Sequence, residues 1–124
     1  MWATDRRLRA RLRVVAACVF WSWASLCRGA ELSDAQARQF LNDKGCNACH
    51  GIEEVRIGPP FKNIAARYRG QDAEFERLVR KIRFGGAGAW GVVPMISYPA
   101  LSHEEIHAIT RWILDLGDEA VRSR

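Results

Sequence analysis

The chain has 124 residues, 48% of them hydrophobic and 27% charged. This length and composition suit one small globular domain and leave no room for a second. The formal charge of +5 invites a nucleic-acid or membrane-surface interpretation. Residues 1–30, however, hold six arginines and one aspartate and so account for the whole excess, whereas residues 31–124 hold 13 basic and 13 acidic side chains. We therefore expect no nucleic-acid partner for the domain.

Residues 1–30 have the pattern of a secretory signal peptide. A segment with five arginines precedes the apolar stretch Val14–Leu26, and small residues follow it within 27–30. An apolar stretch of this length is too short for a typical membrane span of about 20 residues. We expect cleavage within 27–30, which leaves a mature domain of residues 31–124 in the bacterial periplasm. The alternative is an uncleaved segment that associates the domain with the membrane.

The mature chain is predicted to be all-α. Apolar residues recur at helical spacing, and capping boxes are expected at Ser33 with Gln36 and at Ser102 with Glu105. Asp72 is expected to cap the third helix, and the glycine-rich residues 85–95 are expected to form a loop. The predicted helices cover residues 34–44, 60–68, 73–84 and 102–116.

The chemistry of the chain is concentrated at Cys46-Asn47-Ala48-Cys49-His50. Cys-x-x-Cys-His is the attachment sequence of c-type haem, because one tight turn places two thiols at one edge of the porphyrin and the next imidazole at the iron. Half of a zinc site is the alternative, but zinc takes four ligands and the mature chain has no second cysteine pair. We expect one covalently bound haem c, held by Cys46 and Cys49, with His50 as an axial iron ligand.

Met95 is the expected second axial ligand. It is the only methionine beyond the signal segment, and it lies in a glycine-rich segment rather than on a helical apolar stripe. His103 and His107 are competitors for the iron. They also fit the H-E-x-x-H pattern of zinc proteases, but the chain offers no obvious third zinc ligand. A soft thioether favours Fe(II), so a His/Met pair raises the reduction potential relative to two imidazoles.

At this point the sequence resembles the class I cytochromes c, specifically the small bacterial cytochrome c551 (cytochrome c8) group. The resemblance extends from about Leu32 to Leu116, and no gap is needed between the histidine and the methionine. It depends on the final helix around Trp112 and on three segments, Lys44–His50, Ile57–Ala66 and Trp90–Met95.

The resemblance implies a fold of about four helices around the haem and further roles for individual residues. The Pro59 carbonyl would accept a hydrogen bond from Nδ1 of the axial histidine and fix its tautomer. Trp90 and Lys81 would contact a haem propionate. One departure is clear, since Ile96-Ser97-Tyr98-Pro99 stands where the family commonly has Pro-Pro-Asn after its methionine.

These features indicate a monomeric carrier of single electrons that exchanges them with a donor and an acceptor protein in the periplasm. Such a protein is not an enzyme and has no small-molecule substrate. An uncharged rim of Ala48, Ile52, Val92, Val93 and Ile96 is expected around the exposed haem edge. One alternative is a haem c subunit or anchored domain of a larger periplasmic dehydrogenase or reductase. Another is a haem sensor or peroxidase in which Met95 dissociates.

Overall fold

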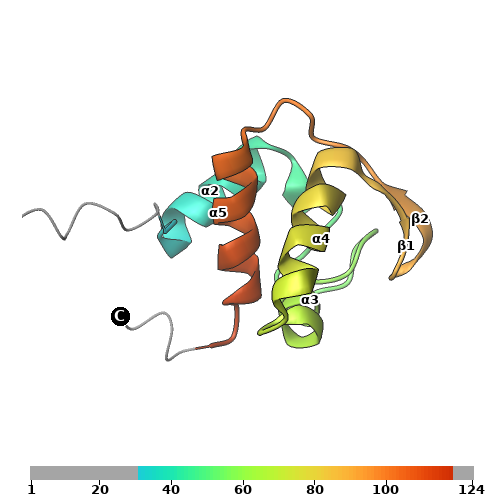
Figure 1. The fold of residues 1–124 in the computed structure, drawn as a ribbon, viewed down its shortest axis with the longest axis horizontal. Helices are drawn as coiled ribbons and strands as arrows, with labels where there is room; N and C mark the ends of the chain where they lie inside the picture. The colour runs from blue at the N-terminus through green and yellow to red at the C-terminus, as the bar shows by residue number, and fades with distance from the viewer. Residues whose placement is uncertain (1–30, 119–124) are drawn as a thin grey trace, which may run out of the picture.

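The computed structural model describes residues 31–118, and the predicted signal segment lies outside this range. Within these residues, four α-helices, one short 3₁₀ helix and one two-stranded sheet follow one another. Helix α5 contacts α2, α3 and α4, while the sheet lies on the far side of α4 (Figure 1). The elements are α2 (Asp34–Asp43), η1 (Cys46–Ala48), α3 (Phe61–Tyr68), α4 (Asp72–Phe84), β1 (Gly86–Gly88), β2 (Gly91–Met95) and α5 (His103–Leu114).

The helix starts follow from local side-chain chemistry. The expected capping boxes are confirmed. The Oγ of each serine, Ser33 and Ser102, accepts from the backbone N–H of the third helical residue, and the side-chain oxygen of that residue accepts from the backbone N–H of the serine. The prediction that Asp72 caps the third helix was wrong. Asp72 is the first helical residue of α4, and Gln71 precedes it without a side-chain capping bond. The carboxylate instead lies in the first turn, where it suits the positive end of the helix dipole.

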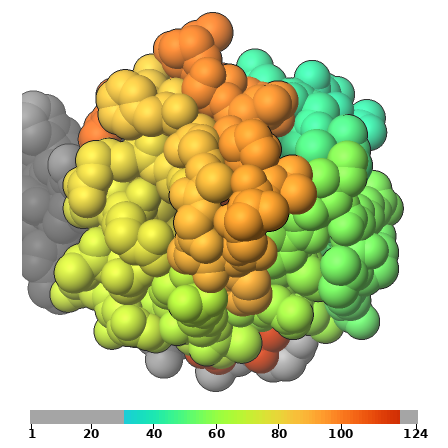
Figure 2. All heavy atoms as spheres, turned by 90° about the vertical axis from the view of Figure 1, so that its right-hand side faces the viewer, coloured from blue at the N-terminus to red at the C-terminus, as the bar shows by residue number. Residues whose placement is uncertain are grey.

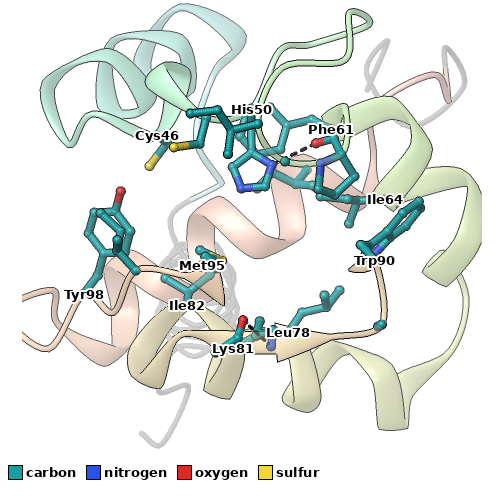
Figure 3. A pocket seen from close by; sticks show the side chains of 18 of the residues that line it. Cys46, His50, Phe61, Ile64, Leu78, Lys81, Ile82, Trp90, Met95 and Tyr98 are labelled. Atoms are coloured by element: carbon teal, nitrogen blue, oxygen red, sulfur yellow. Dashed lines mark hydrogen bonds between the residues drawn. The ribbon is translucent and has the colours of Figure 1, made fainter. Parts of the chain in front are cut away.

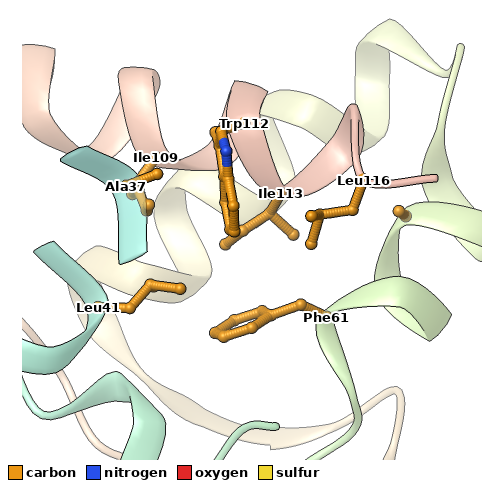
Figure 4. Packing of buried hydrophobic residues seen from close by; sticks show 8 residues of the cluster. Ala37, Leu41, Phe61, Ile109, Trp112, Ile113 and Leu116 are labelled. Atoms are coloured by element: carbon orange, nitrogen blue, oxygen red, sulfur yellow. The ribbon is translucent and has the colours of Figure 1, made fainter. Parts of the chain in front are cut away.

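The hydrophobic core lies where α2, α3 and α5 meet. Leu41 from α2 and Trp112 from α5 both belong to it (Figure 4). Arg69 adds a polar link, because its Nε donates to the Leu114 carbonyl and satisfies a group at the end of α5. The buried members of this core are Ala37, Leu41, Phe61, Ala65, Ile109, Trp112, Ile113 and Leu116.

The prediction of a loop over residues 85–95 was wrong in part. Strands β1 and β2 pair antiparallel, with Gly86 opposite Met95 and Gly88 opposite Gly91. These three glycines have positive φ values, which side-chain-bearing residues rarely adopt, and the register is irregular between Gly86 and Gly88. Strand β1 is Gly-Ala-Gly, and β2 contains a proline and is exposed along most of its length, so neither has the alternating apolar pattern on which strand prediction depends.

In the part of the chain from 31 to 118, no helix has the length and apolar character needed to cross a membrane.

Ile106 provides a test of the core that leaves the haem site untouched. Its side chain is fully buried, in a second cluster with Val79 and Leu101. Replacing it with alanine removes buried methyl groups and leaves a cavity, so Ile106→Ala is expected to lower the free energy of unfolding by about 2–5 kcal/mol. Denaturant titration of the haem-loaded protein measures this. As a control, Val55→Ala acts on a side chain that is 76% exposed and should change the value by less than about 0.5 kcal/mol.

Candidate haem site

An apolar cavity opens between the helices and the β1–β2 hairpin. Its walls come from every helix and from both strands, and both cysteines of the Cys-x-x-Cys-His sequence reach it. The seven residues expected to hold the haem or to contact it directly or through His50 all line it: Cys46, Cys49, His50, Pro59, Lys81, Trp90 and Met95. Figure 3 shows His50 and Met95 on opposite sides of this space, with Cys46 near one end and Trp90 near the other.

The two cysteines are presented by a tight turn. Gly45 adopts φ +75° before η1, and the backbone N–H groups of Cys49 and His50 both donate to the Cys46 carbonyl. This fold-back makes Cys46, Cys49 and His50 neighbours at the cavity. Burial raises the pKa of the Cys46 thiol, against an opposing hydrogen bond from Tyr98. Burial also raises the pKa of the Tyr98 phenol to about 12, so Tyr98 is a protonated donor at neutral pH.

The imidazole of His50 is held in one orientation. Its side chain is buried, its ring stacks on Phe61 with centroids 5.2 Å apart, and its Nδ1 lies 2.8 Å from the Pro59 carbonyl oxygen. A carbonyl can only accept, so Nδ1 carries the proton and Nε2 of the neutral ring keeps a free lone pair. Gly58 allows this packing, because a Cβ there would lie 2.6 Å from Cε1 of His50.

The backbone at Met95 is set by contact with the end of α4. Gly85 terminates that helix at φ +70°, and a Cβ on it would lie 2.4 Å from the Met95 carbonyl oxygen. The following segment is fastened to the same helix, since the Tyr98 N–H donates to the Ile82 carbonyl. Met95 therefore ends β2 at a fixed position on the cavity wall opposite His50 (Figure 3).

Lys81 and Trp90 occupy the hairpin side of the cavity. Lys81 donates from Nζ to the carbonyls of Gly86 and Ala87, at 2.8 Å and 3.0 Å, and so fastens β1 to α4. Trp90 lies in the turn between the strands, is 43% exposed, and packs edge-on against Tyr68 with ring centroids 6.2 Å apart. The expected propionate contacts of both residues remain predictions.

The cavity residues fit a covalently bound haem. The lining is almost wholly apolar, which suits a large flat macrocycle, while two thiols, an imidazole with a free lone pair and a thioether supply the groups that c-type haem requires. A bare metal ion fits less well, because residues 31–118 contain no group of three or more histidine, cysteine or acidic side chains placed to hold one. His103 and His107 do lie together, with ring centroids 3.9 Å apart, but they lack a third ligand.

The expected uncharged rim is found in part. Val93 and Ile96 line the cavity and are exposed, whereas Ala48, Ile52 and Val92 are not part of its lining. Sequence reasoning missed Ile57, which is exposed and lines the cavity immediately before Gly58 and Pro59. Its position within Ile57–Ala66, one of the segments that carry the resemblance, was the available signal.

The fold and the site together define a small helical protein built around a c-type haem. The family model described as Cytochrome c matches residues 34–117, and the chain belongs to that family. Within it, the chain is a class I cytochrome c of the c551-like kind, which carries one covalently bound haem c and functions in electron transfer.

Named relatives support this placement. Cytochrome c-551 of Allochromatium vinosum is 44% identical over 72 residues, covering 58% of this chain and 77% of its own. Cytochrome c-551 of Pseudomonas aeruginosa is 35% identical over 89 residues, covering 72% of this chain and 83% of its own. The crystal structure of Nitrosomonas europaea cytochrome c552 superimposes with a TM-score of 0.60 at 35% identity, covering 64% of this chain and 98% of that one.

Gly85→Ala tests whether the backbone at Met95 depends on the close approach of α4. Gly70→Ala is a control for the positive φ alone, since Gly70 has a similar φ of +74° but no neighbouring atom within 4 Å of the added Cβ. Gly70→Ala should lower the free energy of unfolding only by the cost of a left-handed backbone in a residue with a Cβ, about 1–2 kcal/mol. Gly85→Ala should lower the free energy of unfolding by more, because φ +70° with ψ −150° is nearly restricted to glycine and because the added Cβ would clash with the Met95 backbone. Denaturant titration of both haem-loaded variants measures the difference, and equal losses would contradict the contact.

Proposed function

We propose that this cytochrome is a monomeric, periplasmic carrier of single electrons, and not an enzyme. Cys46 and Cys49 bond the haem covalently, His50 and Met95 are the axial iron ligands, and Pro59, Lys81 and Trp90 support them and the propionates. Residues 1–30 are a secretory signal removed from the mature domain of residues 31–124. The observation that carries the proposal is that the imidazole of His50 and the thioether of Met95 lie on opposite sides of one apolar cavity (Figure 3).

Two fixed ligands suit electron transfer better than substrate chemistry. The hydrogen bond from His50 to Pro59 orients the imidazole and increases its basicity, as partners of ligating histidines generally do. Gly85 restrains the chain at Met95. When bound, the haem supplies a one-electron Fe(III)/Fe(II) couple. Because the His50 ring and the Met95 backbone are both restrained, the site can change oxidation state with little rearrangement.

The apolar walls set the direction in which the potential is shifted. Leu41, Ile82 and Ile113 contribute hydrocarbon to the cavity from three different helices. Such surroundings disfavour the additional positive charge of Fe(III), and a methionine thioether acts in the same direction. The residues of the chain therefore favour a higher reduction potential than two imidazoles would give.

Electrons would enter and leave at the uncharged rim, defined here as Ile57, Val93 and Ile96. Each of these side chains is more than 60% exposed and lines the cavity. Figure 2 shows the hairpin and the following segment, in gold and orange, beside the green segment that leads into α3. A small apolar surface suits a redox-protein partner that must also dissociate. With 13 basic and 13 acidic side chains in residues 31–124, long-range steering would be weak.

Met95→Ala tests the axial pair. The oxidised wild-type protein should show the weak long-wavelength charge-transfer band of sulfur-ligated ferric haem, and its reduced form should not bind carbon monoxide. The variant should lose the band, bind carbon monoxide and have a lower reduction potential, because the Met ligand raises the potential. Optical spectra and redox titration measure these properties. A wild-type protein without the band that binds carbon monoxide would favour a sensor or peroxidase instead.

Val93→Lys tests the rim. A charge placed there must be desolvated on docking, so the rate of electron exchange with the physiological partner should fall several-fold at unchanged reduction potential. Val55→Lys is the control, since Val55 is exposed but does not line the cavity. Stopped-flow kinetics measures both. Equal rates in the two variants would count against docking at the rim, and salt-resistant co-purification with a catalytic chain would indicate a fixed subunit rather than a free carrier.

A further inference from the structure

We propose that Arg67 is the positioning residue of Trp90: it fixes the turn of the hairpin to α3 and so holds the indole at the haem cavity. The inference depends on the proposed function in one respect, namely that Trp90 contacts the haem. Arg67 does not line the cavity, so any effect that it has on the haem must pass through another residue or through its charge.

The guanidinium of Arg67 joins two aromatic rings from different parts of the chain. Its Cζ lies 4.8 Å from the ring centroid of Trp90 and 5.2 Å from that of Tyr68. Both distances are within the range of cation–π attraction. Nη1 also donates to the Ala89 carbonyl at 3.0 Å, so Arg67 contacts both the backbone and the side chain of the hairpin turn.

Tyr68 is the fixed end of this arrangement. Its side chain is 4% exposed, at the end of α3, and the Trp90 ring meets it at an interplanar angle of 80°. The hairpin turn has the opposite character, because Gly88, Ala89 and Gly91 are all exposed. Lys81 fastens only the start of the hairpin, through the carbonyls of β1. Arg67 supplies the corresponding fastening at the turn, where the indole lies.

Arg77 provides a natural comparison. Its Cζ lies 5.0 Å from the Tyr68 ring, and its Nε donates to Glu74 at 2.7 Å within α4. It shares the aromatic platform with Arg67, but it makes neither the stacking contact with Trp90 nor the hydrogen bond to Ala89 that Arg67 makes. Removing its charge therefore tests the platform and the local electrostatics without releasing the hairpin turn.

The experiment is a double-mutant cycle on the haem-loaded protein, with the reduction potential as the readout. Arg67→Met keeps an unbranched stem but loses the charge and the donor, and Trp90→Phe loses the indole N–H. We expect each single variant to shift the potential in the same direction, and the double variant to shift it no further than Trp90→Phe alone. Hydrogen exchange at the Trp90 indole N–H should be faster in Arg67→Met than in the wild type and unchanged in Arg77→Met.

Arg67→Lys separates positioning from charge. Lysine retains the positive charge but cannot present a planar guanidinium between two rings, so Arg67→Lys should shift the potential in the same direction as Arg67→Met. Additive shifts in the cycle, or a wild-type potential in Arg67→Lys, would show a direct charge effect and overturn the inference. An unchanged potential in Trp90→Phe would also overturn it. Either result leaves the axial ligation, which Met95→Ala tests, unaffected.

Discussion

The structure depends on an apolar cavity that a large flat group must fill. Side chains that a helical domain of this size would normally pack against one another, such as Leu41, Ile109 and Ile113, belong both to the buried core and to the cavity wall. The same residues therefore stabilise the fold and surround the cofactor. In a chain this small, where disulfides or metals commonly supplement the core, a covalently attached haem, which we propose is bonded to Cys46 and Cys49, has the corresponding structural role.

Close approaches at two glycines position the His50 ring and the Met95 backbone at the cavity. Gly58 admits the ring of His50, whose Nδ1 is then fixed by the Pro59 carbonyl, and Gly85 admits the backbone of Met95. Both restraints come from elements that are already packed, so the His50 ring and the Met95 backbone have fixed positions at the cavity. A second level of restraint acts on the hairpin, where Lys81 fastens the first strand to α4.

Much of this could be predicted from the sequence because its signals are local. The Cys46–His50 spacing indicates haem, capping boxes locate two helix starts, and helical periodicity finds four helices. The strands were missed because the glycines of β1 and the exposed residues of β2 carry no alternating apolar pattern. The third helix begins at Asp72 itself, one residue earlier than predicted, because an acidic residue is favoured both at the cap and in the first helical turn. The stacking of Arg67 on Trp90 could not be predicted, because it joins residues that only the folded hairpin brings together.

The account is tested most directly by a crystal structure of the protein purified with its haem. It predicts thioether bonds at Cys46 and Cys49, with iron bonded to Nε2 of His50 on one face and to the sulfur of Met95 on the other. The hydrogen bond from His50 to Pro59 should be retained. Iron ligated by His103 or His107, or by water in place of Met95, would contradict the proposed carrier site.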